Sequence, residues 1–451
     1  MNAPASPGRV HVVGAGVAGL AAAVALADMG RSVTLYESAP QAGGRCRSYF
    51  DAELGCRVDN GNHLLLTGNR AALQYVDRIG AGNSFEGPSE ALFPFIHAAT
   101  GERWTLRPNI GALPWWVLSA ARRVPQTRAG DYFAALALRR ADPSATIASV
   151  LDPRQNLFWR LWEPLAVAAL NTGADQGSAA LFWRILAETL GRGGAACRPL
   201  LPRVGLSESF VEPALNRLRA CGAEIRFGAR LRVLAFGPGA VSQLVFDAAS
   251  SELGAADKVI LAVPAAIAAR LVPGLTVPDR HSPIVNAHFR CTPPAGAPFF
   301  VGVVGGAAEW IFRKRGVLSV TVSAADRFVE CDASQLRDLF WRDTAVAYGL
   351  PAQPVPPARI VKERRATFLA SPEQLKRRPQ QVTAWRNLLL AGDYVDTGLP
   401  ATIEGAIRSG FAAAALAAGH PLQAVTGSLS GNRDSLGSPT ENQQERRPAL
   451  P

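Results

Sequence analysis

Three glycines near the start of the chain have the spacing of a pyrophosphate-binding turn. Gly14, Gly16 and Gly19 form the pattern G-x-G-x-x-G. One glycine of such a pattern makes a tight turn, one lets the backbone approach the phosphates, and one lets a helix pack closely on its strand. Glu37 follows where a carboxylate accepts hydrogen bonds from ribose hydroxyls. Glycines that only pack a helix on a sheet would share this spacing, but the acid favours a dinucleotide site without the 2′-phosphate of NADP.

Positioning these residues requires a strand, a turn and a helix in direct succession. The apolar run at 10–13 predicts a buried parallel strand, and the alanine-rich run at 17–29 predicts a helix that ends at Gly30. Residues 33–36 predict a second strand, which completes a βαβ unit. The cofactor contacts predicted in this unit are Gly14, Gly16, Val17, Ala18, Gly19, Glu37 and Ser38.

A second phosphate clamp follows the βαβ unit. In "PQAGGRCRSY", Gly43 and Gly44 precede Arg45. An arginine after two flexible glycines can reach back over the cofactor phosphates as a bidentate donor. A simple NAD dehydrogenase seldom needs such a clamp, so the pattern favours a different dinucleotide.

These two motifs together resemble the FAD-binding signature of the flavoprotein superfamily of amine oxidases, phytoene desaturases and protoporphyrinogen oxidases. The resemblance implies FAD and a third cofactor segment near the C-terminus, where "LLLAGDYVDTGLPATIEGAIRSG" matches at 388–410. Asp393, after a strand at 387–390, would bond the ribitol chain. A helix at 403–417 would point its electropositive end at the flavin pyrimidine edge. The contacts implied here are Gly392, Asp393, Pro400, Ala401, Thr402 and Ile403.

Two further segments gain a role from the same resemblance. A strand at 230–234 would pass beside the adenine, with Val233 in contact. The loop "VDNGNHLLLTGN" at 58–69 would lie against the isoalloxazine and bring Gly61, Asn62 and His63 near the reactive ring. His63 is either a proton donor or a histidine that only hydrogen-bonds its own loop.

The pattern of elements predicts an α/β fold with a discontinuous Rossmann-like FAD-binding domain. The second domain is predicted to be a mixed α+β substrate-binding domain that carries an extra helical region. The α/β pattern returns in the middle of the chain as a helix at 208–222, a strand at 223–236, a hairpin partner at 241–247 and a buried strand at 257–264. The predicted segments are 1–75, 201–268 and 385–421 for FAD binding, 76–200 and 269–384 for substrate binding, and 422–451 as a disordered tail.

A closer resemblance is to the squalene-associated FAD-dependent desaturase family, the hydroxysqualene dehydroxylases of hopanoid biosynthesis. Its narrower motifs here are "GGRCRSYFD", "CRVDNGNHLLLTGN", "LWEPLAVAALNT" and "LLPRVGLSESF". It implies an oxidoreductase of squalene biosynthesis that reduces hydroxysqualene to squalene. Reduced flavin would supply the hydride while the hydroxyl leaves as water, and an electron donor would regenerate the flavin. Since hydroxide is a poor leaving group, an acid must assist.

No catalytic residue is assigned from the sequence. The candidate acids cannot be ranked by spacing, and they are Glu163, Asp175, His63 and Asp396. The sequence also leaves the direction of hydride transfer open, so a polyprenyl or carotenoid desaturase of the same fold is the main alternative. An amine oxidase, and a flavin-containing chaperone or lipid carrier without turnover, are further alternatives.

Aromatic residues are concentrated in the predicted helical region. Aromatic faces suit both a long apolar isoprenoid substrate and an allylic cation. The same side chains would equally serve as ordinary core. The residues concerned are Trp115, Trp116, Phe158, Trp159, Trp162, Phe182 and Trp183.

Composition narrows the class of protein further. The chain has 451 residues, is 48% hydrophobic and carries a formal net charge of +11 at pH 7, as expected for a globular protein with a basic excess. Arginine-rich codon usage or a basic face for lipid headgroups or a phosphorylated ligand would explain that excess. Nucleic acid is not a predicted partner, because no zinc-finger or RNP pattern appears. The scattered cysteines predict neither a metal site nor a disulfide scaffold.

No segment predicts export or a membrane span. The first residues lack the charged and apolar regions of a signal peptide, glycines interrupt the apolar run at 10–27, and 411–419 is too short to cross a bilayer. We therefore predict a cytoplasmic protein. Arginine-rich helices predicted at 119–125 and 135–142 could rest on the inner face of the membrane, although solvated helix faces would look the same.

Overall fold

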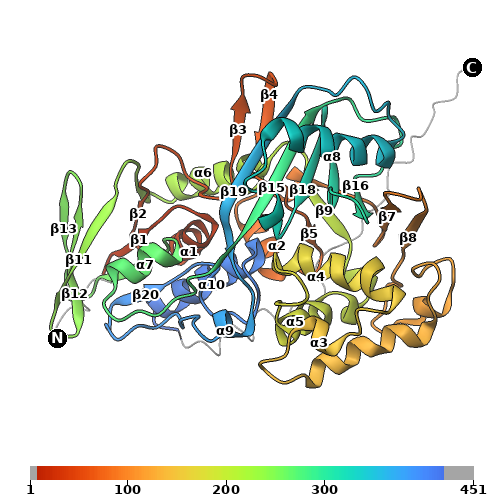
Figure 1. The fold of residues 1–451 in the computed structure, drawn as a ribbon. Helices are drawn as coiled ribbons and strands as arrows, with labels where there is room; N and C mark the ends of the chain where they lie inside the picture. The colour runs from red at the N-terminus through yellow and green to blue at the C-terminus, as the bar shows by residue number, and fades with distance from the viewer. Residues whose placement is uncertain (1–7, 421–451) are drawn as a thin grey trace, which may run out of the picture.

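The computed structural model describes residues 8–420, so the tail predicted at 422–451 lies outside the described residues. The chain folds around two sheets that lie side by side (Figure 1). One sheet is purely parallel, and the other is mostly antiparallel. The α/β class and the Rossmann-like first sheet agree with the sequence prediction.

The parallel sheet has five strands in the order β10-β2-β1-β14-β20. Its strands β1, β2, β14 and β20 are short, apolar and buried at every position or nearly so, because the sheet is covered on both faces. The antiparallel ribbon β11-β12-β13 lies on one side, where Phe246 stacks on Tyr36 with ring centroids 4.5 Å apart. The strands are β1 (Val10–Val13), β2 (Val33–Tyr36), β10 (Glu224–Arg226), β11 (Leu231–Gly237), β12 (Ala240–Phe246), β13 (Ser250–Glu252), β14 (Lys258–Leu261) and β20 (Leu388–Leu390).

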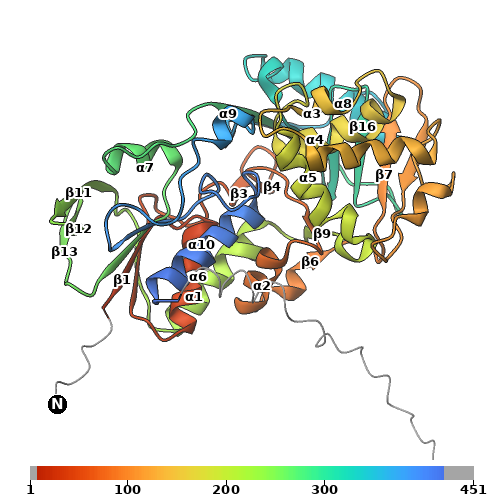
Figure 2. The same cartoon turned by 90° about the horizontal axis from the view of Figure 1, so that it is seen from below.

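The other face of the parallel sheet is covered by a layer of helices (Figure 2). The first and last of them are in direct contact, since a Cβ added at Gly410 would lie 2.2 Å from the carbonyl oxygen of Ala18. Helix α1 follows β1 and helix α10 follows the parallel strand β20, so the N-terminal ends of both helices lie toward the same edge of the sheet. The layer consists of α1 (Val17–Asp28), α2 (Arg70–Arg78), α6 (Glu212–Ala220) and α10 (Ile403–Ala417).

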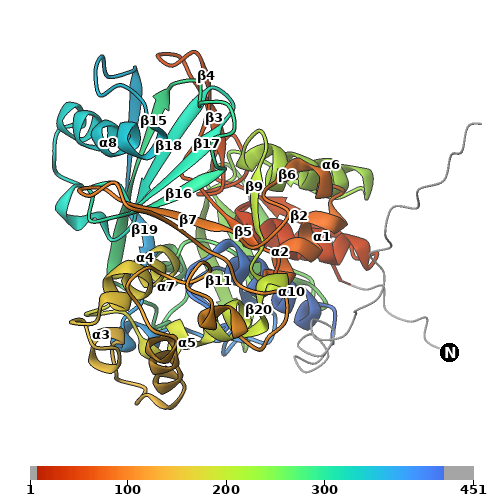
Figure 3. The same cartoon turned by 90° about the vertical axis from the view of Figure 1, so that its right-hand side faces the viewer.

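The second sheet has seven strands in the order β19-β15-β18-β17-β16-β7-β8. Helix α8 (Ala333–Tyr348) packs on one face, and the helical region lies toward the opposite side (Figure 3). The strands are β7 (Phe93–His97), β8 (Arg103–Leu106), β15 (His281–Arg290), β16 (Phe300–Val304), β17 (Trp310–Lys314), β18 (Val317–Val322) and β19 (Ala358–Phe368). The helical region contains η2 (Trp115–Leu118), η3 (Ala129–Arg140), α3 (Ile147–Val150), η4 (Phe158–Trp162), α4 (Glu163–Leu170) and α5 (Ala179–Glu188).

Smaller elements connect the two sheets. The hairpin β3-β4 and the ribbon β5-β9-β6 lie between them. Along the chain, α7 precedes strand β15 and α9 follows strand β19. Their bounds are β3 (Ser48–Asp51), β4 (Cys56–Asp59), β5 (Leu65–Leu66), β6 (Phe85–Glu86), β9 (Pro199–Pro202), α7 (Ala265–Leu271) and α9 (Pro372–Leu375).

Three sequence predictions about elements were wrong. The strand predicted at 223–236 is two strands in different sheets, because Gly228, with φ of 68°, breaks it. The arginine-rich stretch at 119–125 forms turns, in which the Arg123 guanidinium donates to the carbonyl oxygens of Val117 and Thr127. Strands β7 and β8 lie inside the segment 76–200, which was predicted to be helical, and they form one end of the seven-stranded sheet.

Candidate cofactor and active site

The three glycines of the first turn do different work. A Cβ at Gly14 would lie 2.3 Å from the carbonyl oxygen of Ala262, and one at Gly19 would lie 1.9 Å from that of Gly14. Both glycines are therefore required by packing alone. A Cβ at Gly16 would meet nothing within 4 Å, so packing does not explain this glycine. The open space in front of it, at the N-terminus of α1, is where a pyrophosphate would approach the backbone.

Glu37 holds the rim of this turn. One carboxylate oxygen, Oε2, accepts a hydrogen bond from the amide of Ala15 at 2.8 Å. The other, Oε1, accepts from the amide of Ala39 at 2.9 Å and from the hydroxyl of Ser38 at 3.1 Å. The carboxylate is thus fixed beside the glycine turn, at the end of β2.

Arg45 and Asp393, predicted from opposite ends of the sequence, form an ion pair. The guanidinium Nη2 lies 2.8 Å from Asp393 Oδ1, and Nη1 donates to the carbonyl oxygen of Ala366 at 2.5 Å. The charge of Asp393 raises the pKa of Arg45, so the guanidinium remains cationic. The backbone of Gly43 and Gly44 takes positive φ values of 111° and 58° and turns the chain toward Gly16.

The N-terminus of α10 completes this edge of the sheet. Thr402 caps the helix by accepting a hydrogen bond from the amide of Gly405 at 3.1 Å. The amide of Gly392 donates to the hydroxyl of Ser409 at 2.8 Å, which ties the preceding loop to the helix. The described chain therefore brings together the predicted segments around Gly16, Gly44, Arg45, Asp393 and the turn at Pro400, Ala401, Thr402 and Ile403. Val233 lies on β11 with 51% of its surface exposed.

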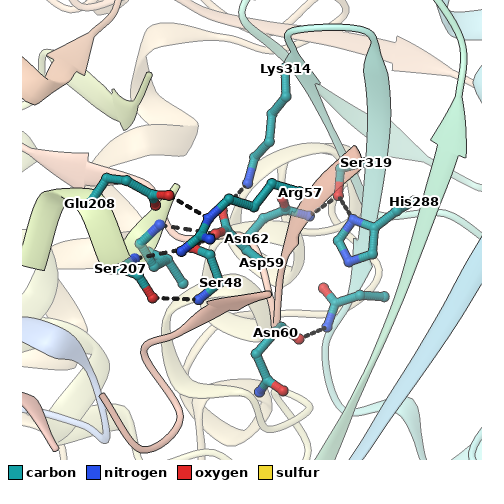
Figure 4. A network of polar contacts seen from close by, with 12 residues as sticks. Ser48, Arg57, Asp59, Asn60, Asn62, Ser207, Glu208, His288, Lys314 and Ser319 are labelled. Atoms are coloured by element: carbon teal, nitrogen blue, oxygen red, sulfur yellow. Dashed lines mark hydrogen bonds and ion pairs between the residues drawn. The ribbon is translucent and has the colours of Figure 1, made fainter. Parts of the chain in front are cut away.

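The loop at 58–63 is bonded to the second sheet through a buried polar network (Figure 4). Asn62 Nδ2 donates to Ser319 Oγ at 2.7 Å and to Thr321 Oγ1 at 2.9 Å. His288 Nδ1 lies 2.6 Å from the same Ser319 oxygen, and Thr321 donates to Asn286 Oδ1 at 2.7 Å. Residues of β15 and β18 thus present hydrogen-bonding groups from mid-strand toward the loop.

An ion pair between Asp59 and Lys314 lies at one side of this network. Burial alone would raise the pKa of Asp59, but the Lys314 charge and bonds from Ser48 and the Leu206 amide lower it below its ordinary value. Asp59 is therefore ionised, and it anchors β4 to both β17 and the start of η7 (Ser207–Val211).

His63 lies close to this ion pair and to Arg45. Burial lowers the pKa of His63 to about 4, so its ring is neutral at pH 7. A neutral imidazole is a poor source of a proton for a departing hydroxyl. The structure therefore argues against the interpretation of His63 as a proton donor.

Two carboxylates outside the parallel sheet, Glu309 and Glu163, have raised pKa values. Burial raises the pKa of Glu309 to about 7, and the charge of Glu163 adds to the shift. Glu309 Oε2 accepts a hydrogen bond from the Ser323 amide at 2.8 Å. Burial also raises the pKa of Glu163, at the start of α4. The other candidate acids are exposed, and Asp396 lies 3.7 Å from Arg378.

The family model for flavin-containing amine oxidoreductases matches residues 17–418. The chain belongs to this family. This flavin oxidoreductase is 46% identical over 410 residues to hydroxysqualene dehydroxylase of Zymomonas mobilis, and the match covers 91% of this chain and 99% of that protein. It is 48% identical over 408 residues to hydroxysqualene dehydroxylase of Rhodopseudomonas palustris, and the match covers 90% of this chain and 97% of that protein.

Solved structures show the same fold. Cyclohexylamine oxidase from Brevibacterium oxydans matches with a TM-score of 0.67 at 15% identity, over 92% of this chain and 99% of that chain. A putative protoporphyrinogen oxidase from Exiguobacterium matches with a TM-score of 0.64 at 17% identity, over 92% and 100%. The prediction of FAD agrees with membership of a flavin-containing family.

Sequence reasoning missed two residues of this flavin oxidoreductase. Arg378 is buried, and its guanidinium donates to the carbonyl oxygens of Leu399 at 2.7 Å and Val395 at 2.5 Å, which fixes the loop after Asp393. Glu309 occurs in "AAEWIF", where nothing distinguishes it from a surface glutamate. Neither residue belongs to a local motif, so no sequence signal could have found them.

The aromatic residues divide into two groups. Trp116, Phe158, Trp162 and Phe182 are buried core, and Tyr132 packs between Trp116 and Trp162 at centroid distances of 5.2 and 6.1 Å. Trp115 and Trp159 are exposed on the surface, and Trp183 is half-buried. Ordinary core packing therefore accounts for most of these aromatic residues, and a ligand is not needed to explain their burial.

Proposed function

We propose that the chain is an FAD-dependent hydroxysqualene dehydroxylase, an oxidoreductase of squalene and hopanoid biosynthesis. The observation that carries this proposal is identity of 46% and 48% over nearly the whole length of relatives with that name. Its substrate is a long apolar isoprenoid, and an electron donor returns the flavin to its reduced state.

Within this function we assign FAD to the edge of the parallel sheet. Gly16 and the N-terminus of α1 would receive the pyrophosphate, and Glu37 the adenosine ribose, with Val233 near the adenine. Arg45 would contact phosphate, and Asp393 the ribitol chain. The 2.8 Å contact between the Arg45 and Asp393 side chains supports a single continuous site, because the phosphate and the ribitol that they would contact adjoin in FAD. The loop at 61–63 and the start of α10 would flank the flavin.

The division into domains follows from the same assignment. We propose an FAD-binding domain formed by 1–75, 201–268 and 385–421, and a substrate domain formed by 76–200 and 269–384. The shared parallel sheet of β1, β2, β10, β14 and β20 supports the first of these.

Reduced FAD, when bound, would supply a hydride to the allylic carbon. The protein must deliver a proton to the hydroxyl oxygen as the carbon–oxygen bond breaks, so that water and not hydroxide leaves. We assign this proton to Glu309. Its Oε2 already accepts the Ser323 amide, which leaves Oε1 to carry the proton. Burial raises the pKa of Glu309 to about 7, and the charge of Glu163 adds a smaller effect in the same direction.

Turnover of hydroxysqualene tests the proposal directly. Purified protein loaded with FAD and supplied with a chemical reductant under anaerobic conditions should convert hydroxysqualene to squalene and water. Absence of squalene would contradict the proposal. Bleaching of oxidised FAD by squalene or phytoene, without a reductant, would instead indicate a desaturase. A bound flavin that responds to none of these lipids would indicate a carrier.

A further inference from the structure

One surface of the helical region exposes large apolar side chains within a short stretch of chain. They lie on the loop before η2, on η2 and on η3, which form one edge of the molecule, remote from the α1 and α10 layer (Figure 2). We call this the apolar edge. Its members, with exposed fractions, are Ile110 at 79%, Leu113 at 78%, Trp115 at 49%, Leu118 at 70%, Phe133 at 53% and Leu136 at 55%.

Packing inside the region forces these side chains outward. Trp116 and Tyr132 meet edge to face with centroids 5.2 Å apart, and they form the buried side of η2 and η3. Their neighbours Trp115 and Phe133 must then face away from the core. The loop before η2 is held rigidly, since Asn109 Nδ2 donates to the carbonyl oxygens of Gly111 and Leu113 at 2.9 and 3.0 Å. The apolar edge is therefore a built surface.

The charge of this segment is strongly one-sided. Between residues 107 and 140 every basic residue is an arginine, and Asp131 is the only acidic residue. The guanidinium of Arg122 lies over the Trp115 ring at 4.8 Å from its centroid. The arginines are Arg107, Arg122, Arg123, Arg128, Arg139 and Arg140. Apolar side chains mixed with cations are the composition that binds the interface of an anionic bilayer.

A cavity opens next to the apolar edge. It has a volume of about 290 Å³, and its lining includes Asp131 and Ala134 of η3 and the polar residues Asp152 and Gln155. Phe158 and Trp162 of η4 line it as well. The cavity thus joins the surface of η3 to the aromatic core of the helical region.

We propose that the apolar edge docks the protein on the surface of an anionic phospholipid bilayer, and that the cavity beside it receives the apolar substrate from the bilayer. The arginines favour a bilayer over a second copy of this chain, because two such cationic surfaces would repel each other. No helix among the described residues is long and apolar enough to cross a membrane, so the contact is peripheral. Only the substrate part rests on the proposed function.

Sedimentation of the full chain with vesicles tests the docking. Vesicles of phosphatidylcholine with phosphatidylglycerol should bind the protein, and pure phosphatidylcholine vesicles should bind it at least tenfold more weakly. The variant Leu118→Ser/Phe133→Ser should lose at least tenfold in binding. The control Phe50→Ser/Val204→Ser removes exposed apolar side chains of 66% and 64% elsewhere and should change binding less than twofold.

Charge and self-association are tested in parallel. Arg139→Gln/Arg140→Gln should weaken binding to the anionic vesicles and leave binding to neutral vesicles unchanged. Equal binding by the apolar-edge variant and the wild type would overturn the proposal. A dimer in size-exclusion chromatography that the apolar-edge variant abolishes, without vesicle binding by either protein, would overturn it in favour of a second copy.

Activity separates docking from the proposed function. With substrate embedded in anionic vesicles, the apolar-edge variant should turn over at least tenfold more slowly than wild type. With substrate dispersed in detergent, the two should agree within about twofold. If neither protein forms squalene, the proposed function fails while the binding assay still decides the docking.

Discussion

The parallel sheet and the seven-stranded sheet use burial in different ways. In the parallel sheet, strands β1, β14 and β20 are mostly apolar, and the charged residues Glu37 and Asp393 follow the ends of strands. The buried polar side chains within this sheet include His11 of β1 and Thr34 of β2. In the seven-stranded sheet, Ser319, Thr321 and His288 are buried polar residues in the middle of strands. The first sheet serves as a rigid support for turns, whereas the second carries polar chemistry on its own face.

The glycine turn is the place where the parallel sheet can be broken most completely. Gly19→Val should prevent folding, because its Cβ would lie 1.9 Å from the carbonyl oxygen of Gly14. Gly16→Val should fold, since nothing lies within 4 Å of its Cβ, but it should lose FAD. Soluble yield and circular dichroism report folding, and visible flavin absorbance reports cofactor. A folded Gly16→Val protein that retains FAD would contradict the assignment.

The Lys314 ion pair tests whether the second sheet depends on its buried polar groups. Lys314→Met leaves Asp59 buried without its cation, which should cost about 3–5 kcal/mol of unfolding free energy. Denaturant unfolding measures this loss. Arg364→Met is a matched control, because it breaks an exposed pair with Glu330, and it should have little effect. Equal stability of both variants would show that the buried pair is dispensable.

Glu309→Gln tests the proton delivery that we assign to Glu309, next to the seven-stranded sheet. The amide keeps the bond from Ser323 but cannot supply a proton, so kcat should fall about 100-fold while FAD stays bound. Burial raises the pKa of Glu309 to about 7, and in the proposed mechanism only its protonated form can deliver the proton. Wild-type activity should therefore fall as pH rises through about 7. A wild-type pH profile that rises over this range would exclude Glu309 as the acid.

Arg45→Gln tests the proposed cofactor contact at the edge of the parallel sheet. The substitution removes a charged donor near the phosphates, which should weaken FAD binding by about 2 kcal/mol, roughly thirty-fold. Fluorescence titration of the apoprotein with FAD measures this change. Arg47→Gln is the control, since Arg47 lies two residues away on the same segment and takes no part in the ion pair with Asp393. A similar loss of FAD affinity in both variants would show that the positive charge of this segment, and not a specific contact of Arg45, supports FAD binding.

The same contrast explains what the sequence could predict. The bounds of β1, β2 and α10 were predicted to within one residue, because each has its signal in consecutive residues, and the ion pair of Arg45 with Asp393 joins two predicted motifs. The polar network could not be predicted. His288 meets Ser319, and Asn286 meets Thr321, only through the antiparallel register of β15 and β18, which no local pattern specifies.

Glu309 and Arg378 escaped prediction for a related reason. Their roles come from burial, which raises the pKa of one and directs the other to backbone carbonyls. Burial of a charged side chain depends on how distant segments pack, and the sequence around each residue is ordinary. Segments 93–97 and 103–106 were missed because the tryptophans and prolines that follow suggested helices.

The contact between α1 and α10 sets an order of events during synthesis. Residues 14–19 leave the ribosome early, while Asp393, β20 and α10 leave it close to the end. Until then the parallel sheet lacks its edge strand, and α1 lacks the helix against which Ala18 packs at Gly410. With FAD at the proposed site, its loading would therefore follow translation of nearly the whole chain. A translation product that stops before β20 would expose the apolar surface of α1 and offer a target to chaperones and proteases.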